Sequence, residues 1–439
     1  MTRLADDAQQ VAASPDPVVR RVQERYHKLL DEGADPHEWP YAWRTELNRG
    51  GFRAFDFLMR EIVDTGKCIG CASCLTICPT DVFDYADEQP VDSRTEACVY
   101  CVLCAEVCPV LRPVDKDLPR MLHFREPALD EGYGTYSYAM YTRATDPEVL
   151  GRGQDGGLVS TLMIHGLETG ALGGAILGDV LPDNNQIGTH TLAMTRPEVL
   201  ACAASRYTYS PNTLALQEAM RRDVKPLAVV GVPCQVDGVR LQQNSSIRLE
   251  MANWYRENIS LVVGLFCSEA FTHESIIKLG EMVDVAPERI ENINIKGKVV
   301  IRLDDGEVLN ASLKQYRDFA RPACLYCLDY GAENADLATG GIGLDGWTYT
   351  LVRTEAGHRA LQAAVDDGCL ETRPLADEPR GEFLMNRLSA AKKVNRPLPA
   401  QMPTYQQRQA LNWLDPKTFY TKGPGAPPPA PDHEQGGSE

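Results

Sequence analysis

The chain has 439 residues, of which 44% are hydrophobic and 24% are charged, and its formal net charge is −17 at pH 7. This composition is typical of an ordinary globular protein, and the acidic balance argues against a nucleic acid or an anionic membrane surface as the main partner. No run of about 18 apolar residues is present, so the sequence predicts no membrane span.

The amino-terminal segment predicts a helical arm without a targeting signal. Residues 1–17 are acidic and polar, and the pair Arg20-Arg21 is followed by polar residues where a targeting signal needs an apolar core. Apolar side chains in 18–30 share one helical face, so we expect residues 1–55 to be helical. We therefore expect a cytoplasmic protein, whose 14 cysteines are metal ligands and not a disulfide scaffold.

The segment 56–125 contains two cysteine motifs of identical spacing, C-x2-C-x2-C-x3-C-P, which begin at Cys68 and Cys98. This is the ligand pattern of a ferredoxin with two [4Fe–4S] clusters, in which the fourth cysteine of each motif binds the other cluster. The spacing predicts one cluster on Cys68, Cys71, Cys74 and Cys108, and the other on Cys98, Cys101, Cys104 and Cys78. A zinc site or disulfides are the alternative, but zinc usually takes paired C-x2-C knuckles. Two clusters held close together serve to move single electrons.

Strands and helices are expected to alternate after this unit. Between the two motifs, residues 82–85 predict a strand and residues 87–90 a turn. In the segment 126–224 we expect strands at 136–141, 171–177 and 189–193. Helices are expected at 158–167 and 213–222, the second one capped by Asn212 or Thr213.

The segment 225–395 begins with two continuous apolar runs, 227–232 and 261–266, which are typical of strands buried on both faces. Residues 299–309 predict a hairpin with an Asp-Gly turn. A strand at 348–352 and a helix at 355–365 follow. Residues 396–439 are rich in proline and predict a disordered tail.

A glycine-rich segment matches the dinucleotide-binding pattern G-x-G-x-x-G from Gly151 to Gly156, with Asp179 further on. The first glycine should follow a strand directly, but residues 146–150 intervene, which disfavours a Rossmann site. A looser interpretation is a loop that opens a helix and holds a phosphate on its backbone N–H groups. Its lining residues would be Gln154, Asp155, Gly156, Gly157, Ser160 and Thr161. A turn followed by a capped helix is the alternative.

Residues 205–211 place a cation among aromatic and hydroxyl side chains. Arg206 would pair with a pyrophosphate and Tyr207 would stack on a flat ring. A surface ion pair with tyrosines in the core is the alternative.

Four later cysteines suggest a further cluster. Cys234 and Cys267 each follow a predicted buried strand, and Cys324 and Cys327 form a C-x2-C pair. If the two strands are adjacent and parallel, their carboxyl ends meet, and four thiolates would hold a third [4Fe–4S] cluster. The alternative is that these cysteines act as small hydrophobic residues. Cys202 and Cys369 have no evident partners and are expected to be inert.

Six sequence blocks resemble the coenzyme F420 hydrogenase/dehydrogenase beta subunit family. They occupy residues 153–160, 205–210, 231–235, 265–267, 324–329 and 346–357. The resemblance implies FAD as the central cofactor and a [4Fe–4S] cluster on the later cysteines. It also implies that the flavin is surrounded by the glycine loop, by Ser205 to Tyr209 and by a segment from Thr339 to Thr348 that contains Gly340 and Gly341. Where the family reads Gly-Gln-Gly-Gly, this chain has Asp155, which is unfavourable beside a phosphate.

The chemistry of the predicted cofactors leads to the same function. Clusters carry single electrons while a deazaflavin or a nicotinamide carries a hydride, and a flavin exchanges both. We therefore predict an oxidoreductase that passes electrons between reduced coenzyme F420, as the substrate, and [4Fe–4S] clusters through FAD. Its expected partners are the large or small subunits of a hydrogenase or dehydrogenase complex, or a ferredoxin. A ferredoxin-dependent reductase of chlorophyll-type tetrapyrroles and a non-catalytic electron-transfer subunit are the alternatives.

The expected fold class is α+β or α/β, with a two-cluster ferredoxin-like domain before a mixed α/β flavin-binding domain. The division is a helical arm (1–55), the ferredoxin-like domain (56–125), the amino- and carboxyl-terminal domains of the resembled family (126–224 and 225–395) and the tail (396–439).

Overall fold

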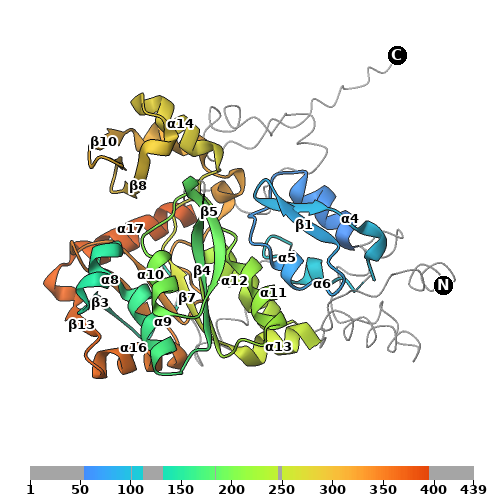
Figure 1. Cartoon of the computed structure of the whole chain (residues 1–439), viewed down its shortest axis with the longest axis horizontal. Coiled ribbons are helices and arrows are strands. Elements are labelled where there is room, and N and C mark those ends of the chain that lie inside the picture. Colours follow the sequence, from blue (N-terminus) through green and yellow to red (C-terminus); the bar gives the residue numbers. More distant parts are fainter. Residues whose placement is uncertain (1–53, 100, 112–131, 183, 246–249, 395–439) are drawn as a thin grey trace, which may run out of the picture.

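The computed structural model describes residues 54–99, 101–111, 132–182, 184–245 and 250–394. The predicted tail and all but the last two residues of the predicted helical arm lie outside these ranges. The described chain has three parts: a small unit with the two cysteine motifs, a larger unit built on one sheet, and a subdomain at one end of that sheet (Figure 1).

The two cysteine motifs fold alike, as their identical spacing predicts. The second and third cysteines of each motif flank a residue in the left-handed conformation, Ala72 with φ 59° and Val102 with φ 57°. A short helix follows each of them, α5 (Ser73–Thr76) and α6 (Leu103–Glu106). The remaining elements of this unit are α4 (Ala54–Leu58), η2 (Met59–Val63), β1 (Phe83–Ala86), β2 (Gln89–Asp92) and η3 (Thr95–Ala97).

The hairpin β1–β2 confirms the predicted strand and the turn at Asp87, and it shows that Gln89 and Pro90, which were predicted as part of the turn, begin a second strand. Asp87 and Glu88 both have positive φ, 48° and 61°, as a tight two-residue hairpin turn requires. The chain then returns as β2, in which Pro90 pairs with Tyr85. The proline is tolerated in β2 because this sheet has only two strands in the described chain, both of them edges.

The larger unit is organised on an eight-stranded mixed sheet in the order β13-β3-β12-β11-β7-β6-β4-β5. The four central strands β11, β7, β6 and β4 are parallel, and antiparallel strands flank them on both sides. The strands are β3 (Tyr138–Ala144), β4 (Gly174–Leu181), β5 (Asn184–Ala193), β6 (Leu227–Gly231), β7 (Ile259–Leu265), β11 (Leu337–Gly340), β12 (Thr348–Val352) and β13 (Leu370–Pro374). The segments 126–224 and 225–395 both contribute strands, so they share one sheet.

Helices cover both faces of this sheet. One layer contains α8 (Pro147–Arg152), α9 (Leu158–Glu168), α10 (Arg196–Ala201) and α16 (Glu355–Asp366), and the other contains η4 (Asn212–Leu214), α11 (Ala215–Arg221), α12 (Pro233–Gln243) and α13 (Glu250–Asn258). Successive residues of β6 alternate between the two cores, with Ala228 and Val230 in one and Leu227 and Val229 in the other. Burial on both faces explains why the sequence reads as a continuous apolar run. The chain continues through η8 (Leu375–Asp377) into α17 (Arg380–Val394).

The predicted helix 213–222 begins one residue earlier, with a 3-10 turn, and lacks the predicted cap. It consists of η4 and α11, and no side chain caps either of them. Asn212 instead donates its Nδ2–H to the carbonyl of Val230 at 2.8 Å, and the Thr213 hydroxyl donates to the carbonyl of Cys71. Tertiary contacts therefore use the side chains that the sequence assigned to the cap.

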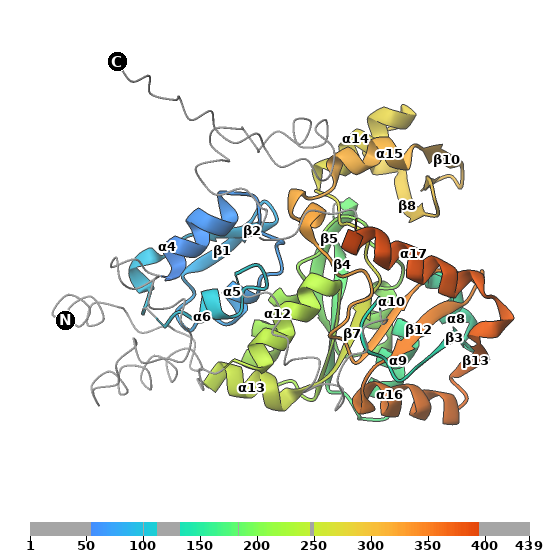
Figure 2. The ribbon, with the colours of Figure 1, turned by 180° about the vertical axis from the view of Figure 1, so that it is seen from behind.

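The subdomain lies between β7 and β11 in the sequence and has its own core, which includes Leu279, Ile293 and Tyr316. Its elements are α14 (Glu274–Val283), η5 (Pro287–Arg289), β8 (Ile290–Ile295), β9 (Val299–Leu303), β10 (Val308–Ala311), α15 (Leu313–Tyr316) and η6 (Arg317–Phe319). The predicted hairpin is present as β9–β10, and β8 adds a third strand that the sequence did not predict. Figure 2 shows this roof subdomain (residues 274–319) beyond the end of the sheet near β5 and α17.

The unit with the cysteine motifs packs on the α12 side of the sheet (Figures 1 and 2). Ile77 and Leu103 belong to the same apolar core as Val236 and Val239 of α12. The Tyr255 hydroxyl of α13 donates to the carbonyl of Thr76 at 2.7 Å. The two units thus share one hydrophobic core. None of the helices in the described ranges has the length and apolarity needed to cross a bilayer.

Candidate functional site

The structure brings the first predicted set of thiols together, Cys68, Cys71, Cys74 and Cys108. Burial raises the pKa of the Cys74 thiol, and the charges of Cys71, Cys68 and Cys108 raise it further. The backbone N–H of Gly70 donates to the Cys68 sulfur at 3.4 Å. The fourth cysteine of the second motif therefore joins the first three of the first motif, as the spacing predicted.

The second set, Cys78, Cys98, Cys101 and Cys104, lines one small cavity whose walls include Phe55 and Phe83. Burial raises the pKa of Cys104, followed by the charges of Cys101, Cys98 and Cys78. Cys104 is also among the charges that raise the pKa of Cys74, so the two sets are neighbours.

The third set combines cysteines that lie far apart in the sequence. Cys234 lies in the first turn of α12, Cys267 follows β7, and Cys324 and Cys327 lie in and after η7 (Pro322–Tyr326). They meet because β6 and β7 are adjacent and parallel, which brings their carboxyl ends to one edge of the sheet. Burial raises the pKa of Cys234, followed by the charges of Cys327, Cys71, Cys267 and Cys324.

These three sets fit [4Fe–4S] clusters on chemical grounds. Four thiolates that are buried or partly buried and repel one another need positive charge between them, which the iron atoms of a cluster supply. Within the ranges that the structure describes, no three His, Cys, Asp or Glu side chains lie close enough to hold a single metal ion. In a cube each thiolate binds a different iron atom, so its ligands stand farther apart than those of one ion.

Helix α12 connects the third set to the first. Its first turn carries Cys234, whose neighbours include Cys71 of the first set. One turn later a Cβ atom on Gly238 would overlap the hydroxyl of Ser73 and lie 3.5 Å from the Cys71 sulfur. The absence of a side chain at this position therefore lets α12 lie directly on the loop of the first motif.

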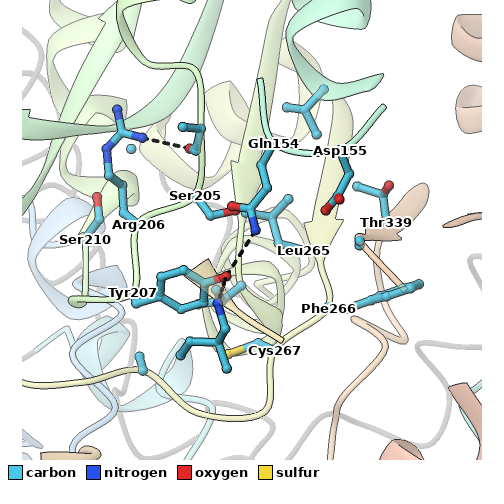
Figure 3. Close-up of a pocket in the computed structure, with 18 of the residues that line it drawn as sticks. Gln154, Asp155, Ser205, Arg206, Tyr207, Ser210, Leu265, Phe266, Cys267 and Thr339 are labelled. Atoms are coloured by element: carbon cyan, nitrogen blue, oxygen red, sulfur yellow. Dashed lines mark hydrogen bonds between the residues drawn. The ribbon is translucent and has the colours of Figure 1, made fainter. Parts of the chain in front are cut away.

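A cavity of about 530 Å³ opens beyond the carboxyl ends of β6, β7 and β11, which is where open α/β sheets bind ligands. Leu265, Phe266 and Cys267 line it together with Gln154 and Tyr207 (Figure 3). Of the cofactor contacts that the sequence predicted, the lining contains Gln154, Gly157, Ser160, Ser205, Arg206, Tyr207, Gly340 and Gly341. Cys267 therefore belongs both to the cavity and to the third thiol set.

Two predicted contacts, Gly156 and Thr161, are not among the lining residues. The Gly156 N–H donates to the Thr348 hydroxyl at 3.0 Å, and a Cβ there would overlap the carbonyl of Thr142. The Thr161 hydroxyl donates to the carbonyl of Gly157 at 3.0 Å. Both residues serve the packing of the loop, which sequence spacing does not distinguish from ligand contact.

The dinucleotide pattern is not realised. Helix α8 occupies the residues between β3 and the loop, with Asp146 as its cap, and Gly151 lies inside that helix. The loop proper is 153–157, and Asp155 and Gly157 in it have positive φ, 54° and 70°. It opens α9, in agreement with the looser interpretation of a glycine-rich loop before a helix.

Asp155 is compensated by a residue of the roof subdomain. Its Oδ1 accepts a hydrogen bond from the Lys296 ammonium at 3.1 Å, and only a tenth of its side chain is exposed. The carboxylate also lies directly against Gly341, where a Cβ would overlap it. The ion pair offsets the negative charge that the sequence suggested would oppose a phosphate.

Tyr207 is held at the cavity wall by a network that joins three segments. The Gln154 amide donates to the Tyr207 hydroxyl at 3.2 Å and to Asn294 Oδ1 at 2.8 Å (Figure 3). The backbone N–H of Ile295 also donates to the Tyr207 hydroxyl, at 3.2 Å. Burial raises the pKa of Tyr207, so the phenol stays neutral. Strand β8 of the roof subdomain is thereby tied to the glycine loop.

Arg206 lines the cavity with an incompletely bonded guanidinium group. It donates from one terminal nitrogen to the carbonyls of Ala203 and Ala204, at 2.9 and 2.8 Å. Its Nε is buried and has no hydrogen-bond partner among the described residues. Burial lowers the pKa of Arg206, and the described residues offer it no ion pair. A buried unbonded N–H is costly, so this position suits an anion such as a phosphate and not the surface ion pair considered from sequence.

Sequence reasoning missed the contribution of the roof subdomain. Asn294, Ile295, Gly297, Leu313 and Arg317 all line the cavity, yet no motif marks them. Cys202 also lines the cavity, and burial raises its pKa to about 12. That value agrees with an unreactive thiol.

Comparison with known proteins identifies three matched segments. Two of them match the family described as "Coenzyme F420 hydrogenase/dehydrogenase, beta subunit", residues 139–217 its amino-terminal part and residues 224–378 its carboxyl-terminal part. Residues 61–115 match a 4Fe-4S dicluster domain.

Several proteins with known names are similar to this chain. It is 34% identical over 265 residues to the coenzyme F420 hydrogenase beta subunit of Methanothermobacter thermautotrophicus, which covers 59% of this chain and 92% of that protein. It is 25% identical over 349 residues to an F(420)H(2) dehydrogenase subunit of Methanosarcina mazei, which covers 76% of this chain and 91% of that protein. A chain of the F420-reducing [NiFe] hydrogenase complex from Methanosarcina barkeri superposes with a TM-score of 0.57 and 30% identity, over 69% of this chain and 99% of that chain.

Proposed function

Because this chain belongs to the coenzyme F420 hydrogenase/dehydrogenase beta subunit family and has a 4Fe-4S dicluster domain near its amino terminus, we propose that it is an iron–sulfur flavoprotein. In this proposal it passes electrons between reduced coenzyme F420 and [4Fe–4S] clusters through FAD. It acts as the electron-exchange subunit of a hydrogenase or dehydrogenase complex.

The observation that supports this function most is that the cavity and the three thiol sets lie next to one another in a row. Cys267 of the third set lines the cavity. Cys234 of the same set has Cys71 of the first set as a neighbour, and Cys74 of the first set has Cys104 of the second. A continuous series of neighbouring thiol sets that begins at a ligand cavity is what transfer of single electrons requires.

The cavity residues offer suitable contacts for FAD. Arg206 presents an unbonded N–H for a phosphate, and the loop 153–157 at the start of α9 adds backbone donors. Tyr207 offers a fixed aromatic face, and the lack of side chains at Gly340 and Gly341 allows close approach to the backbone. Bound FAD would supply the exchange of a hydride on one side and of single electrons on the other. Because the roof subdomain also lines the cavity, it would help to exclude water from the flavin.

The named relatives support coenzyme F420 as the hydride carrier. The match to the dehydrogenase subunit of Methanosarcina mazei covers 76% of this chain. The segment from residue 139 to the carboxyl end of the chain is a smaller share than this. The match therefore includes residues before 139, where the dicluster domain lies. We therefore favour a role in which electrons from the reduced coenzyme leave through the dicluster domain to a partner subunit or a ferredoxin.

Purification without oxygen tests this function. We expect stoichiometric FAD and about twelve iron atoms per chain, four for each proposed cluster. Reduced coenzyme F420 should then bleach the flavin and cluster absorption, while NADH should not. Full FAD and iron content without bleaching by the reduced coenzyme would exclude the proposed substrate.

A matched pair of cysteine variants tests the third set. The change Cys267→Ser should remove about four iron atoms, whereas Cys202→Ser, in the same cavity but outside the set, should remove none. Wild-type protein with only about eight iron atoms would contradict a third cluster.

A further inference from the structure

The last turn of α17 places a buried lysine against the third thiol set. Lys392 has 3% of its surface exposed, and its ammonium group donates to the Cys327 sulfur at 3.2 Å. It also donates to the carbonyl of Asp329 at 2.9 Å. The positive charge of Lys392 lies close enough to Cys267 and Cys324 to lower the pKa of both thiols against the larger effect of burial. One ammonium group therefore faces three of the four cysteines.

Burial of an ammonium group is costly unless negative charge compensates it. The neighbouring Lys393 is more accessible: its ammonium pairs with the Glu333 carboxylate at 2.5 Å, and its side chain is 35% exposed. Lys392 donates to sulfur and to a carbonyl oxygen. A cluster bound through four thiolates carries net negative charge, which would interact favourably with this buried cation.

We propose that Lys392 is a positioning residue that raises the reduction potential of the cluster held by Cys234, Cys267, Cys324 and Cys327. This inference rests on the third cluster of the proposed function. Uptake of one electron makes a cluster more negative, and a fixed cation in a low-dielectric interior stabilises the more negative form. Hydrogen bonds to cluster sulfurs raise the potential as well. No bond breaks and no proton moves in this step; in the proposed function, bound flavin would supply the electron.

The consequence concerns the direction of electron flow inside the chain. The third set stands between the cavity and the first set. A higher potential at this point makes it an acceptor for single electrons from the cavity. Lys392 thus acts on the reaction only through the cluster, without contact with the hydride carrier.

Potentiometric titration of the full-length protein with dithionite, followed by electron paramagnetic resonance, tests the inference. The change Lys392→Met removes the charge and keeps most of the side-chain volume. It should lower the equilibrium constant for reduction of the third cluster about tenfold, which is about 59 mV for one electron. Lys392→Arg should retain the wild-type potential, and Lys393→Met should leave it unchanged. The signals of the other two clusters, identified in Cys267→Ser protein, should stay constant throughout.

An unchanged potential in Lys392→Met protein that retains about twelve iron atoms would overturn the inference. If Lys392→Met protein holds only about eight iron atoms, the Lys392→Arg variant tests the inference instead. Because it keeps a cation at this position, it should hold about twelve iron atoms and have the wild-type potential. Failure of Lys392→Arg to restore them would also refute the role of the charge. A wild-type protein without the third cluster would instead refute the proposed function, before any variant is compared.

Discussion

Arg206 illustrates how a single side chain carries information that its sequence context does not. In the sequence it stands among tyrosines and serines and fits either a surface ion pair or a phosphate site. In the structure its Nε is buried without a partner beside a cavity. An unbonded buried N–H lowers the stability of the folded state, and a hydrogen bond to a bound anion would offset that loss of free energy.

We predict that Arg206→Met weakens FAD binding by about 1.5–3 kcal/mol, the usual contribution of a charged hydrogen bond, or about ten- to a hundredfold in Kd. Fluorescence titration of flavin-free protein with FAD measures this. The control is Arg152→Met, an arginine of α8 with a side chain 57% exposed that pairs with Glu148. Equal affinity of the two variants would show that Arg206 does not contact the cofactor.

Asp155 shows the opposite case, a residue that looked unfavourable and is compensated from far away in the chain. Lys296 is 141 positions distant and reaches it only because the roof subdomain covers the cavity. A change that the sequence marks as a departure from its family can therefore be neutralised by a contact that no local pattern predicts.

At the level of elements, α12 relates the third thiol set to the first. It begins beside Cys234 and continues past Gly238, where its backbone lies on the first cysteine motif. The helix is thus both the source of one cluster ligand and the surface that sets the separation between two sets.

The same substitution, glycine to alanine, at two helical positions tests whether α12 must pack closely on the first cysteine motif. Gly238→Ala should crowd Ser73 and Cys71, lower the free energy of unfolding by about 1–3 kcal/mol, and slow reduction of the dicluster domain by reduced coenzyme F420. Gly151→Ala in α8, where a Cβ meets nothing within 4 Å, should instead stabilise by about 0.5–1 kcal/mol and leave the rate unchanged. Denaturant titration and stopped-flow absorption measure both. Equal behaviour of the two variants would contradict close packing at Gly238.

At the level of the whole molecule, a buried ion pair joins the two units. Arg321, which precedes η7, pairs with Glu88 of the hairpin β1–β2, and the side chains of both are 8% exposed. Arg321 also donates to the carbonyl of Cys68 at 3.3 Å and lies 4.6 Å from the ring centre of Tyr209. Charge, backbone and aromatic contacts thus converge where the unit with the cysteine motifs meets the larger unit.

We predict that Glu88→Gln destabilises the protein by about 3–5 kcal/mol, because it leaves Arg321 buried without its anion. Glu218→Gln is the control, since Glu218 pairs with Arg222 at the surface with about half of each side chain exposed, and such pairs contribute about 0–1 kcal/mol. Denaturant unfolding measures stability, and hydrogen exchange at β1 and β2 reports whether the two units separate. A loss below 1 kcal/mol in Glu88→Gln would argue that water reaches the pair.

The sequence predicted the local chemistry and most central elements of the fold. The spacing of the two cysteine motifs, the buried strands β6 and β7 and the hairpin β9–β10 all follow from patterns within a few residues. It did not predict that segments 126–224 and 225–395 share a sheet, nor the strand β8, because pairing between distant strands leaves no local periodicity. Asn212 and Thr213 show the same limit, since their side chains make tertiary contacts in place of the predicted cap.

By itself the sequence determined which side chains can bind iron and at what spacing, because the ligand geometry of a motif is set by the backbone between neighbouring cysteines. Only the tertiary structure decided that the condition for the third set is met, so that Cys234, Cys267, Cys324 and Cys327 lie together. It also decided three contacts between distant residues: Lys392 with Cys327, Lys296 with Asp155, and Arg321 with Glu88. Those contacts depend on the parallel order of the strands and on how the roof subdomain and α17 pack. Packing of distant segments is a property of the whole chain, and no short stretch of residues encodes it.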